Sequence, residues 1–587
     1  AAPKDPADLY TRMAYVRENH WKLTHLLNYN QTFYKHDIGM LLGFEEERFV
    51  KRTTDTAKLG LIDSSVGDSS SATTPSSIGG TGEEFTSRSY FGRINYAFDS
   101  RYLFEVNMRY DGSSRFAPDN RWGLFPSFSA GWRISEERFM KGLPIDNLKL
   151  RASWGKLGNN AIGNYEWQAV YNSAKYAFGG SLNNGLAITS ISNNLLEWES
   201  TAIGIDFATL RNRLTFEAEF YNKVTDGILY RPDMYMSLGT ASGPRQNIAE
   251  VTNRGIEMTL NWQDRIGKVE YRVSGNFAYN QNKVSKYKGE LQRGWVTDEN
   301  GNRVYQTNIG DVSTGGSTRV IEGKMINEYY MLQPYKGSGN GFNADGTVNI
   351  NGGPRDGMIR TVDDMKWLNA MVGAGYKFYP RQNVSKSGIW YGDYIYADLN
   401  GDGVYGNDAD NEFQGCSNVP KYNFGLQASA NWKGFDFSMN WSGAAGFKIY
   451  YYRLALNSSA TIKGYAIGEA IANDHYFFDP KNPNDPRTNL SSKNPRLTNN
   501  SGNDQSGMTQ SSVHLQKGDY IKLKNLTIGY TLPAVLSKKV YAQNIRFFAS
   551  GENLFTITGY EGMDPEMRTA VGYSTMRQYA FGVNITF

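Results

Sequence analysis

The sequence predicts an all-β protein, a large antiparallel β-barrel of the kind that spans a membrane. Three observations predict it. Apolar and polar residues alternate with a period of two along most of the chain, the connections between these segments alternate between short and long, and no run of eighteen apolar residues exists. Since lipid requires every backbone hydrogen bond to be made within the protein, a closed barrel is the remaining way for such a chain to span a membrane.

Composition agrees with strands that are apolar on one side only. The 587 residues are 40% hydrophobic and 14% aromatic, with 39 Tyr, yet the mean hydropathy is −0.54. The net charge of +4 indicates neither nucleic acid nor an acidic partner. Cys416 is the single cysteine, so no intrachain disulfide or cysteine metal cluster is expected. Residues 1–8 lack the features of a signal peptide.

The last strand shows the alternation most clearly. Apolar side chains take every second position in Tyr579, Phe581, Val583, Ile585 and Phe587. In a soluble sheet this face would point to a core, whereas in an outer-membrane barrel it points to lipid. The same pattern recurs in 90–98, 102–110, 214–221, 256–262, 269–279, 424–432, 435–442, 523–532 and 544–551. With weaker segments included, we expect roughly fourteen to eighteen strands of about ten residues.

Connection lengths separate the two ends of these strands. The expected short turns are 99–100, 211–213, 264–267 and 433–434. The expected long loops are about 57–86, 282–322, 335–420 and 454–518. Short turns at one end and long loops at the other are typical of periplasmic turns and extracellular loops. A propeller would repeat about every forty residues, and no such repeat is present.

Several motifs occur in a fixed order along the chain. They are YDGSSRF at 110–116, WGLFPSFSAGW at 122–132, LKLRASWGKLG at 148–158, DLNGDG at 398–403, YIKLKNLTIGYTL at 520–532, SGENLF at 550–555 and GMDPE at 562–566. In this order and spacing they resemble the SusC-like (RagA-like) TonB-dependent transporters of the Gram-negative outer membrane.

The resemblance implies a 22-stranded barrel of which this chain supplies most strands. Family members carry a plug domain, a TonB box and the first strands ahead of the point where Ala1 lies. We therefore expect an N-terminal plug and barrel fragment as a separate chain, with the TonB complex acting through it. The resemblance also implies a SusD-like lipoprotein over the long loops, and import of a large oligosaccharide or oligopeptide.

One segment has the pattern of a calcium loop. Residues 398–404 place oxygen side chains at positions 1, 3 and 5 of an EF-hand-like loop, Gly at position 6 and a backbone carbonyl at position 7. Position 12 is Ala409, so the usual bidentate Glu is missing. A turn without metal is the alternative. The candidate ligands are Asp398, Asn400, Asp402, Val404, Asp408 and Asp410.

Aromatic residues in the long loops are the candidate substrate contacts, because their flat faces stack on sugars or hold peptides. Packing within the loops is the alternative for each. The candidates are Trp295, Tyr305, Trp367, Trp390 and Tyr391.

Motifs for catalysis are absent from the sequence. None of the five His begins H-E-x-x-H, and neither G-x-S-x-G nor C-x-x-C occurs. We expect no enzyme and no organic cofactor.

The polar faces of the strands are expected to line a water-filled conduit. They are represented by Glu105, Asn107, Arg109 and Gln427. The alternatives are a soluble or surface carbohydrate-binding β-protein, a surface glycoside hydrolase and a passive porin.

Overall fold

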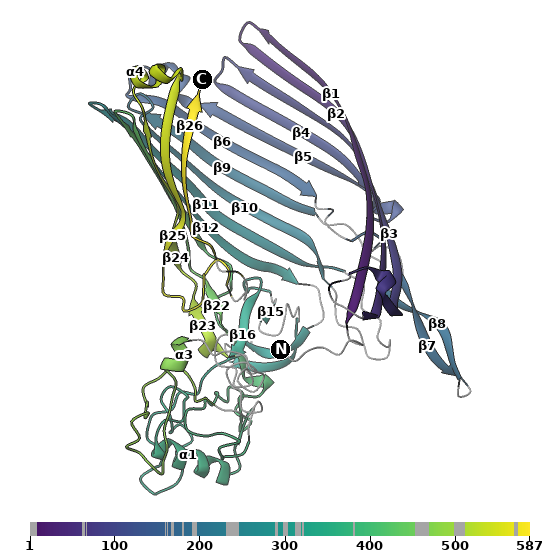
Figure 1. Ribbon diagram of the computed structural model, residues 1–587, viewed down its shortest axis with the longest axis vertical. Helices are drawn as coiled ribbons and strands as arrows, with labels where there is room; N and C mark the ends of the chain where they lie inside the picture. Colours follow the sequence, from purple (N-terminus) through teal and green to yellow (C-terminus); the bar gives the residue numbers. More distant parts are fainter. Residues whose placement is uncertain are drawn as a thin grey trace. The chain divides into compact units, whose positions relative to one another are not determined.

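One antiparallel sheet of 15 strands dominates the protein, and its strands are hydrogen-bonded in the order β1-β2-β3-β4-β5-β6-β9-β10-β11-β12-β20-β21-β24-β25-β26 (Figure 1). The all-β prediction is confirmed, and the number of strands lies within the expected range. The computed structural model describes residues 9–61, 65, 67–158, 160, 163–165, 170–178, 181–190, 197–230, 246–287, 291–297, 303–310, 318–319, 322–379, 382–451, 469–497, 511–568, 573 and 575–587.

The strands of this sheet are β1 Tyr10–Phe33, β2 His36–Leu61, β3 Ala72–Phe98, β4 Tyr102–Ser113, β5 Trp122–Arg133, β6 Ile145–Gly158, β9 Glu197–Thr209, β10 Leu214–Tyr230, β11 Gln246–Ile266, β12 Val269–Tyr287, β20 Tyr422–Trp432, β21 Phe435–Ala445, β24 Tyr520–Thr531, β25 Asn544–Thr558 and β26 Gln578–Thr586.

In the part of the chain that the structure describes, short strands and three α-helices occupy the connections. The strands are β7 Val170–Phe178, β8 Ser181–Ser190, β13 Leu291–Thr297, β14 Arg303–Gly310, β15 Thr318–Arg319, β16 Glu328–Leu332, β17 Lys377–Phe378, β18 Val404–Tyr405, β19 Asn411–Phe413, β22 Lys448–Tyr450 and β23 Leu515–Lys517. The helices are α1 Val362–Gly373, α3 Glu469–Asn473 and α4 Ala534–Ser537. No helix in the described part of the chain has the length and apolarity to cross a membrane.

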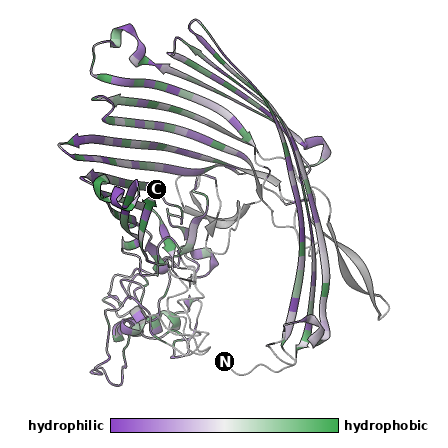
Figure 2. Ribbon diagram, turned by 45° about the horizontal axis from the view of Figure 1, so that its top comes forward, coloured by the Kyte–Doolittle hydropathy of each residue, from purple (hydrophilic) through white to green (hydrophobic). Residues whose placement is uncertain are grey.

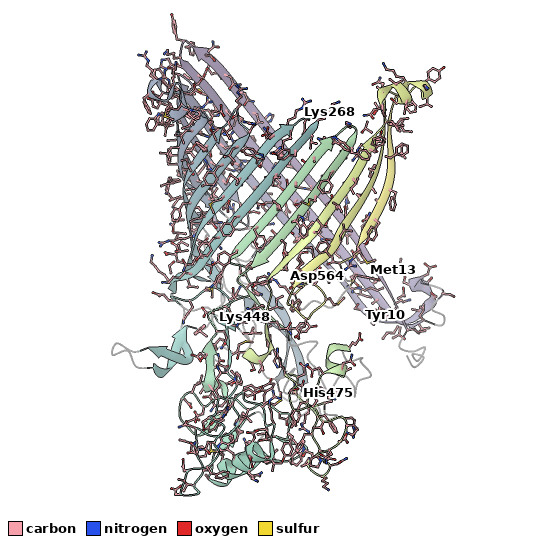
Figure 3. The ribbon with its side chains drawn as sticks, turned by 90° about the vertical axis from the view of Figure 1, so that its left-hand side faces the viewer. Tyr10, Met13, Lys268, Lys448, His475 and Asp564 are labelled. Carbon is pink, nitrogen blue, oxygen red and sulfur yellow. The ribbon has the colours of Figure 1, made fainter. Side chains whose placement is uncertain are left out.

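The chain divides into two units. Unit 1 holds residues 1–206 and 221–250, and unit 2 holds residues 207–220 and 251–587. Within unit 2, Lys268 lies at the end of β11 and β12 that carries their short turn, and Asp564 lies at the opposite end of β24 and β25 (Figure 3). Short turns and long loops are therefore segregated in this unit, as the connection lengths predict.

The register gives β20 and β21 one apolar and one polar face each. In β20 and β21, Leu426 pairs with Trp441, and the next residue along, Gln427, pairs with Asn440. Figure 2 shows this alternation as hydrophobic and hydrophilic bands along the strands. The apolar face is open: Leu426 keeps 40% of its surface exposed and Phe581 keeps 83%. A soluble sandwich would bury this face, so the exposure favours the barrel.

The tight turn between β20 and β21 follows from two residues. Lys433 and Gly434 have φ values of 47° and 90°, and two consecutive positive φ angles make the type I′ turn that matches strand twist. The turn expected at 264–267 is shorter than predicted, because β11 continues to Ile266 and leaves only Gly267 and Lys268.

The expectation of a long loop at 57–86 is wrong. Most of this segment extends β2 and β3, which pair from Leu61 and Ala72 down to His36 and Phe98. Gly, Ser and Pro residues favour a loop in this segment, but backbone pairing between two long strands outweighs the weak strand propensity of Gly and Pro.

We expect an arginine at position 426 to destabilise the protein in a bilayer by about 2–4 kcal/mol, because it places a charge in hydrocarbon. The matched variant Gln427→Arg points to the other face and should leave the unfolding free energy nearly unchanged. Denaturant unfolding in lipid vesicles measures both. Equal destabilisation by Leu426→Arg and Gln427→Arg would contradict the assignment of faces.

Candidate functional site

The polar face of unit 1 forms a connected hydrogen-bond network, which we call the polar wall (the alternate side chains of β2–β6 that include Glu105, Asn107 and Arg109). Asn107 donates to Glu105 (2.7 Å) and accepts from Arg93 Nε (2.8 Å). Arg109 donates to both carboxylate oxygens of Asp111 (2.7 and 2.8 Å). The three residues predicted on this wall are therefore brought together on one strand, β4, in paired form.

The polar wall is hollowed near the turn that joins β1 and β2. The hollow has a volume of about 630 Å³ and forms where small residues such as Gly39, Ala97 and Gly131 meet. Lys149 and Arg151 border it, and both pair with Asp206 (3.3 and 3.1 Å). Paired charges around small side chains make a hydrated surface without a reactive group.

The polar face of unit 2 contains Gln427, as predicted, opposite Asn440. One ion pair on this face spans three strands: Arg546 on β25 pairs with Asp436 on β21 (2.6 Å) across Gly529 on β24. A Cβ at Gly529 would lie 2.6 Å from the nearest guanidinium nitrogen of Arg546, so the ion pair requires glycine there.

The long connections build a separate hydrophobic core, the loop subdomain (residues 332–405 and 474–497 in their described parts). Trp367 lies at its centre on α1, fully buried, stacked on Tyr335 (5.1 Å) and donating its indole N–H to Asn349 O (2.8 Å). Trp367 cannot reach a ligand without opening this core. Its expected role as a substrate contact is therefore corrected to a packing role.

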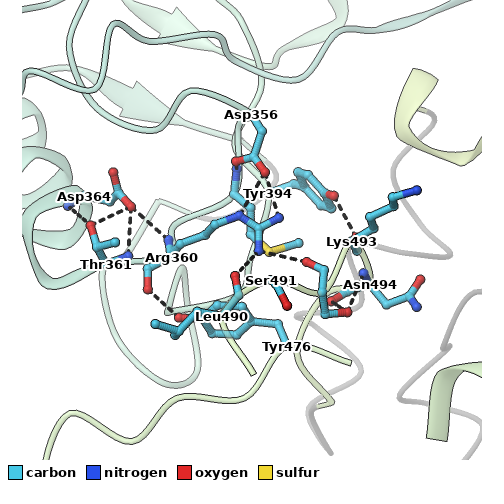
Figure 4. Close-up of polar contacts among 12 residues, drawn as sticks. Asp356, Arg360, Thr361, Asp364, Tyr394, Tyr476, Leu490, Ser491, Lys493 and Asn494 are labelled. Carbon is cyan, nitrogen blue, oxygen red and sulfur yellow. Dashed lines mark hydrogen bonds and ion pairs between the residues drawn. The ribbon is translucent and has the colours of Figure 1, made fainter. Parts of the chain in front are cut away.

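Arg360 joins the two halves of the loop subdomain (Figure 4). Its Nε and one terminal nitrogen both donate to Oδ2 of Asp356 (2.9 and 2.7 Å). It also donates to the backbone carbonyls of Leu490 (2.6 Å) and Ser492 (2.8 Å), more than 120 residues away. The loop subdomain thus has a fixed internal arrangement.

A second arginine positions the predicted ligand aromatics. Arg496 pairs with the buried Asp393 (2.8 Å) and donates to the carbonyls of Lys386 and Gly388. Asp393 in turn accepts the backbone N–H of Trp390 (2.8 Å). Burial raises the pKa of Asp393, and the guanidinium of Arg496 opposes that shift.

Trp390 and Tyr391 line a pocket of about 620 Å³ in the loop subdomain, the loop pocket. Their rings meet edge to face at 5.2 Å, and Tyr391 meets Phe478 at 5.0 Å in the same manner. Polar lining comes from His475, Arg487 and two Asn side chains. The loop pocket offers aromatic surface and polar groups together, which is the usual make-up of a small-ligand site.

Two further predicted substrate contacts, Trp295 and Tyr305, are not among the described residues that line the loop pocket. Trp295 on β13 and Tyr305 on β14 are paired in register, and their side chains lie outside the described residues. Their role as substrate contacts stays a prediction.

The loop predicted to bind calcium is folded by its own side chains. Asp398 accepts hydrogen bonds from two glycine N–H groups of the turn (2.7 and 2.9 Å), Asn400 accepts from Asp402 N–H (3.0 Å), and Asp402 accepts from Val404 N–H (2.8 Å). These oxygens gather around one turn, as an EF-hand-like loop requires.

Asp410 holds this loop from beneath. It is fully buried and accepts N–H groups of Leu399 (2.6 Å), Gly406 (2.8 Å) and Asn407 (3.1 Å). Burial raises its pKa to about 6, although these hydrogen bonds lower it. Asp408 is exposed. Among the described residues, no three His, Cys, Asp or Glu side chains are arranged to hold a metal, so calcium stays a prediction that rests on the 398–404 turn.

Sequence reasoning missed the residues that build the loop pocket. Arg496 and Asp393 are 103 positions apart, and Arg360 contacts a segment 130 positions away. No local pattern marks such pairs. The only signal was the Asn, Pro and Asp content of residues 478–487, which indicates an ordered loop.

Comparison with known proteins finds relatives that match most of the chain. Residues 4–554 match the family model described as TonB dependent receptor-like, beta-barrel. The chain is 29% identical over 601 residues to TonB-dependent receptor P39 of Formosa agariphila, covering 95% of this chain and 52% of that protein. It is 27% identical over 517 residues to TonB-dependent receptor SusC of Bacteroides thetaiotaomicron, covering 85% of this chain and 43% of that protein.

A solved structure, the RagAB peptide transporter, shares the fold, with a TM-score of 0.73 and 20% identity over 98% of this chain and 56% of that chain. The chain spans about half the length of the curated relatives it matches.

We expect Arg496→Ala to loosen the loop pocket, because it leaves the carboxylate of Asp393 buried without its partner. A loss of about 3 kcal/mol corresponds to roughly a hundredfold faster amide exchange in residues 386–393. The control variant Lys366→Ala removes a pair with Asp363 that is exposed on both sides and should leave exchange unchanged. Hydrogen exchange by mass spectrometry measures both, and slow exchange in Arg496→Ala would contradict the positioning role.

Asp402→Ala should lower the calcium content of the purified protein by about one ion per chain, because it removes the position-5 oxygen. Asp345→Ala, which alters another exposed Asp-Gly turn, is the matched control. Elemental analysis after dialysis gives the readout. An unchanged content in Asp402→Ala would remove the metal interpretation.

Proposed function

Because this chain belongs to the TonB-dependent receptor-like β-barrel family, we propose that it forms wall and extracellular loops of an energy-coupled importer in the outer membrane. One observation carries the proposal: strands of this sheet present an exposed apolar face and a polar face whose side chains are paired with one another. That combination suits a wall with lipid on one side and an aqueous conduit on the other.

The proposed cargo is an oligosaccharide or oligopeptide too large for passive pores. The loop pocket supplies an aromatic contact for either class through the partly buried Trp390, whereas Tyr391 is 5% exposed and packs in the hydrophobic core. The polar wall then carries the cargo across without chemistry, since its charges are already paired within the wall.

Energy coupling is proposed to come from the rest of the transporter. A plug domain would occlude the conduit, and the TonB complex would act through it. The edge strands of the described sheet, β1 and β26, each present a row of backbone groups that further strands would pair, because lipid provides no partner for them. A SusD-like lipoprotein is the proposed lid over the loop subdomain.

The rival functions make different demands on the same surfaces. A soluble carbohydrate-binding protein requires the apolar faces to be covered, while Leu426 and Phe581 are exposed. A passive porin uses the same wall but needs no energy. Whether uptake depends on energy therefore distinguishes the importer from a porin.

Deletion of the gene should abolish uptake of the cognate fluorescent oligomer and leave uptake of its monomer unchanged. An uncoupler of the proton gradient should abolish oligomer uptake in the parent strain, since a plugged barrel opens only with energy. Screening oligosaccharide and peptide pools in parallel identifies the cargo class. Uptake that persists after uncoupling would indicate a porin, and uptake that persists after deletion would contradict any import role.

A further inference from the structure

A lysine on the polar face of unit 2 is buried. Lys522 on β24 pairs in register with Ser442 on β21, two residues along from Asn440. Asn440 is the partner of Gln427, which marks the polar face on β20, so Lys522 points to the same side of the sheet. Only 1% of its surface is exposed. Another part of the chain must therefore cover its ammonium group, because a buried charge needs a partner.

The connection between β25 and β26 covers this lysine, and we call it the inner loop (residues 559–577 in their described parts). Lys522 Nζ donates to Asp564 at 2.6 Å and to Glu566 at 2.8 Å. Lys524 stands at an irregularity in the register of β24 and donates to the same carboxylate of Glu566 at 2.6 Å. Two ammonium groups and two carboxylates thus fasten the inner loop to the polar face.

Uncharged contacts hold the beginning of the inner loop. Tyr560 is 5% exposed and meets the ring of Tyr451 edge to face at 5.0 Å, in a small core that includes Ala444 of β21. Glu561 accepts a hydrogen bond from the side chain of Gln516 on β23 (2.7 Å), and its backbone N–H donates to the same side chain (3.0 Å). The loop is therefore seated before it reaches Lys522.

The carboxylates that meet the lysines stay charged. Burial raises the pKa of both Asp564 and Glu566, but hydrogen bonds, first those from Lys522, outweigh burial and hold both pKa values below their ordinary range. Thr575 also donates to Asp564, which ties down the part of the loop that returns to β26. Lifting the loop would leave buried charges without partners. The inner loop is therefore a fixed element of the polar face.

The fastening lies at the end of the sheet that carries the long loops. Asp564 stands at the end of β24 and β25 opposite their short turn (Figure 3). Met563, next to the fastened Asp564, stays exposed, so the loop adds bulk of its own above the strands. A conduit lined by the polar face is consequently narrower at this level than the spacing of its strands alone would make it.

We propose that the inner loop is a fixed constriction near the extracellular mouth of the conduit, and that Lys522 is the positioning residue that holds it there. The constriction limits the width of the oligomer that enters, so linear cargo passes and branched cargo of the same mass is excluded. This role rests on the proposed function, because it requires the polar face to line a conduit.

The first test compares Lys522→Met with Arg546→Met in the complete transporter. Both variants remove a cation from the polar face, but Arg546 pairs with Asp436 inside the sheet and not with the inner loop. We expect amides of residues 560–568 to exchange about a hundredfold faster in Lys522→Met, since two carboxylates lose their buried partner, and at the parent's rate in Arg546→Met. Hydrogen exchange by mass spectrometry measures both.

The second test measures width selection by uptake. The probes are linear and branched glucans of equal mass, and linear and lysine-branched peptides of equal mass. We expect the parent and Arg546→Met to import the linear member of the transported class about tenfold faster than the branched one, and Lys522→Met to reduce this preference to about twofold.

Glu566→Gln is a milder variant, because the amide keeps the shape of the carboxylate and removes its charge. It should speed exchange of the inner loop and admit branched cargo in the same direction as Lys522→Met, and it decides the matter if Lys522→Met fails to fold. A loosened loop with an unchanged linear preference would overturn the proposal, as would unchanged exchange in both variants. Import of neither member of either pair by the parent would instead contradict the proposed function.

Discussion

The structure depends on one constraint: hydrocarbon offers no hydrogen-bond partner to a backbone N–H or C=O. Each strand of the large sheet must satisfy these groups on its two neighbours, and this fixes the register. Register in turn fixes which side chains face outward, because a one-residue slip would move every apolar side chain to the other face. The uninterrupted pairing of β1 with β2, and the single irregularity between β2 and β3, follow from this demand.

Glycines allow the two faces to do different work. At Gly529 the missing side chain lets Arg546 reach Asp436 across a whole strand, which ties three strands together on the polar face. At Gly92 the missing side chain opens a depression on the apolar face instead. Glycine therefore makes room for an ion pair on the polar face and leaves a depression on the apolar face.

The strands were predictable from sequence because their signal is local. A period of two assigns each residue to a face without knowledge of its neighbours, and the hairpin at Lys433 and Gly434 is encoded by two adjacent residues. The loops were predictable only in outline. Trp367 and Trp390 look alike in sequence, yet Trp367 is central to a core and Trp390 borders a pocket. Trp367 is buried by contacts with Tyr335 and Asn349, whereas the pocket beside Trp390 is completed by residues 473–497, and no local pattern marks either set. The Gly, Ser and Pro residues of 72–86 favoured a loop where the structure has a strand, because pairing between long strands overrides local propensity.

The most direct test of the account is the solvent met by alternate residues of β26. Nitroxide labels at Phe581 and Asn584, introduced into a Cys416→Ser background, report collisions with oxygen, which partitions into lipid, and with a water-soluble nickel complex. The account predicts that the label at 581 collides mainly with oxygen and the label at 584, on the opposite face of β26, mainly with nickel. Labels at both positions that meet water equally, or a label at 581 shielded from both reagents in a protein interior, would contradict it.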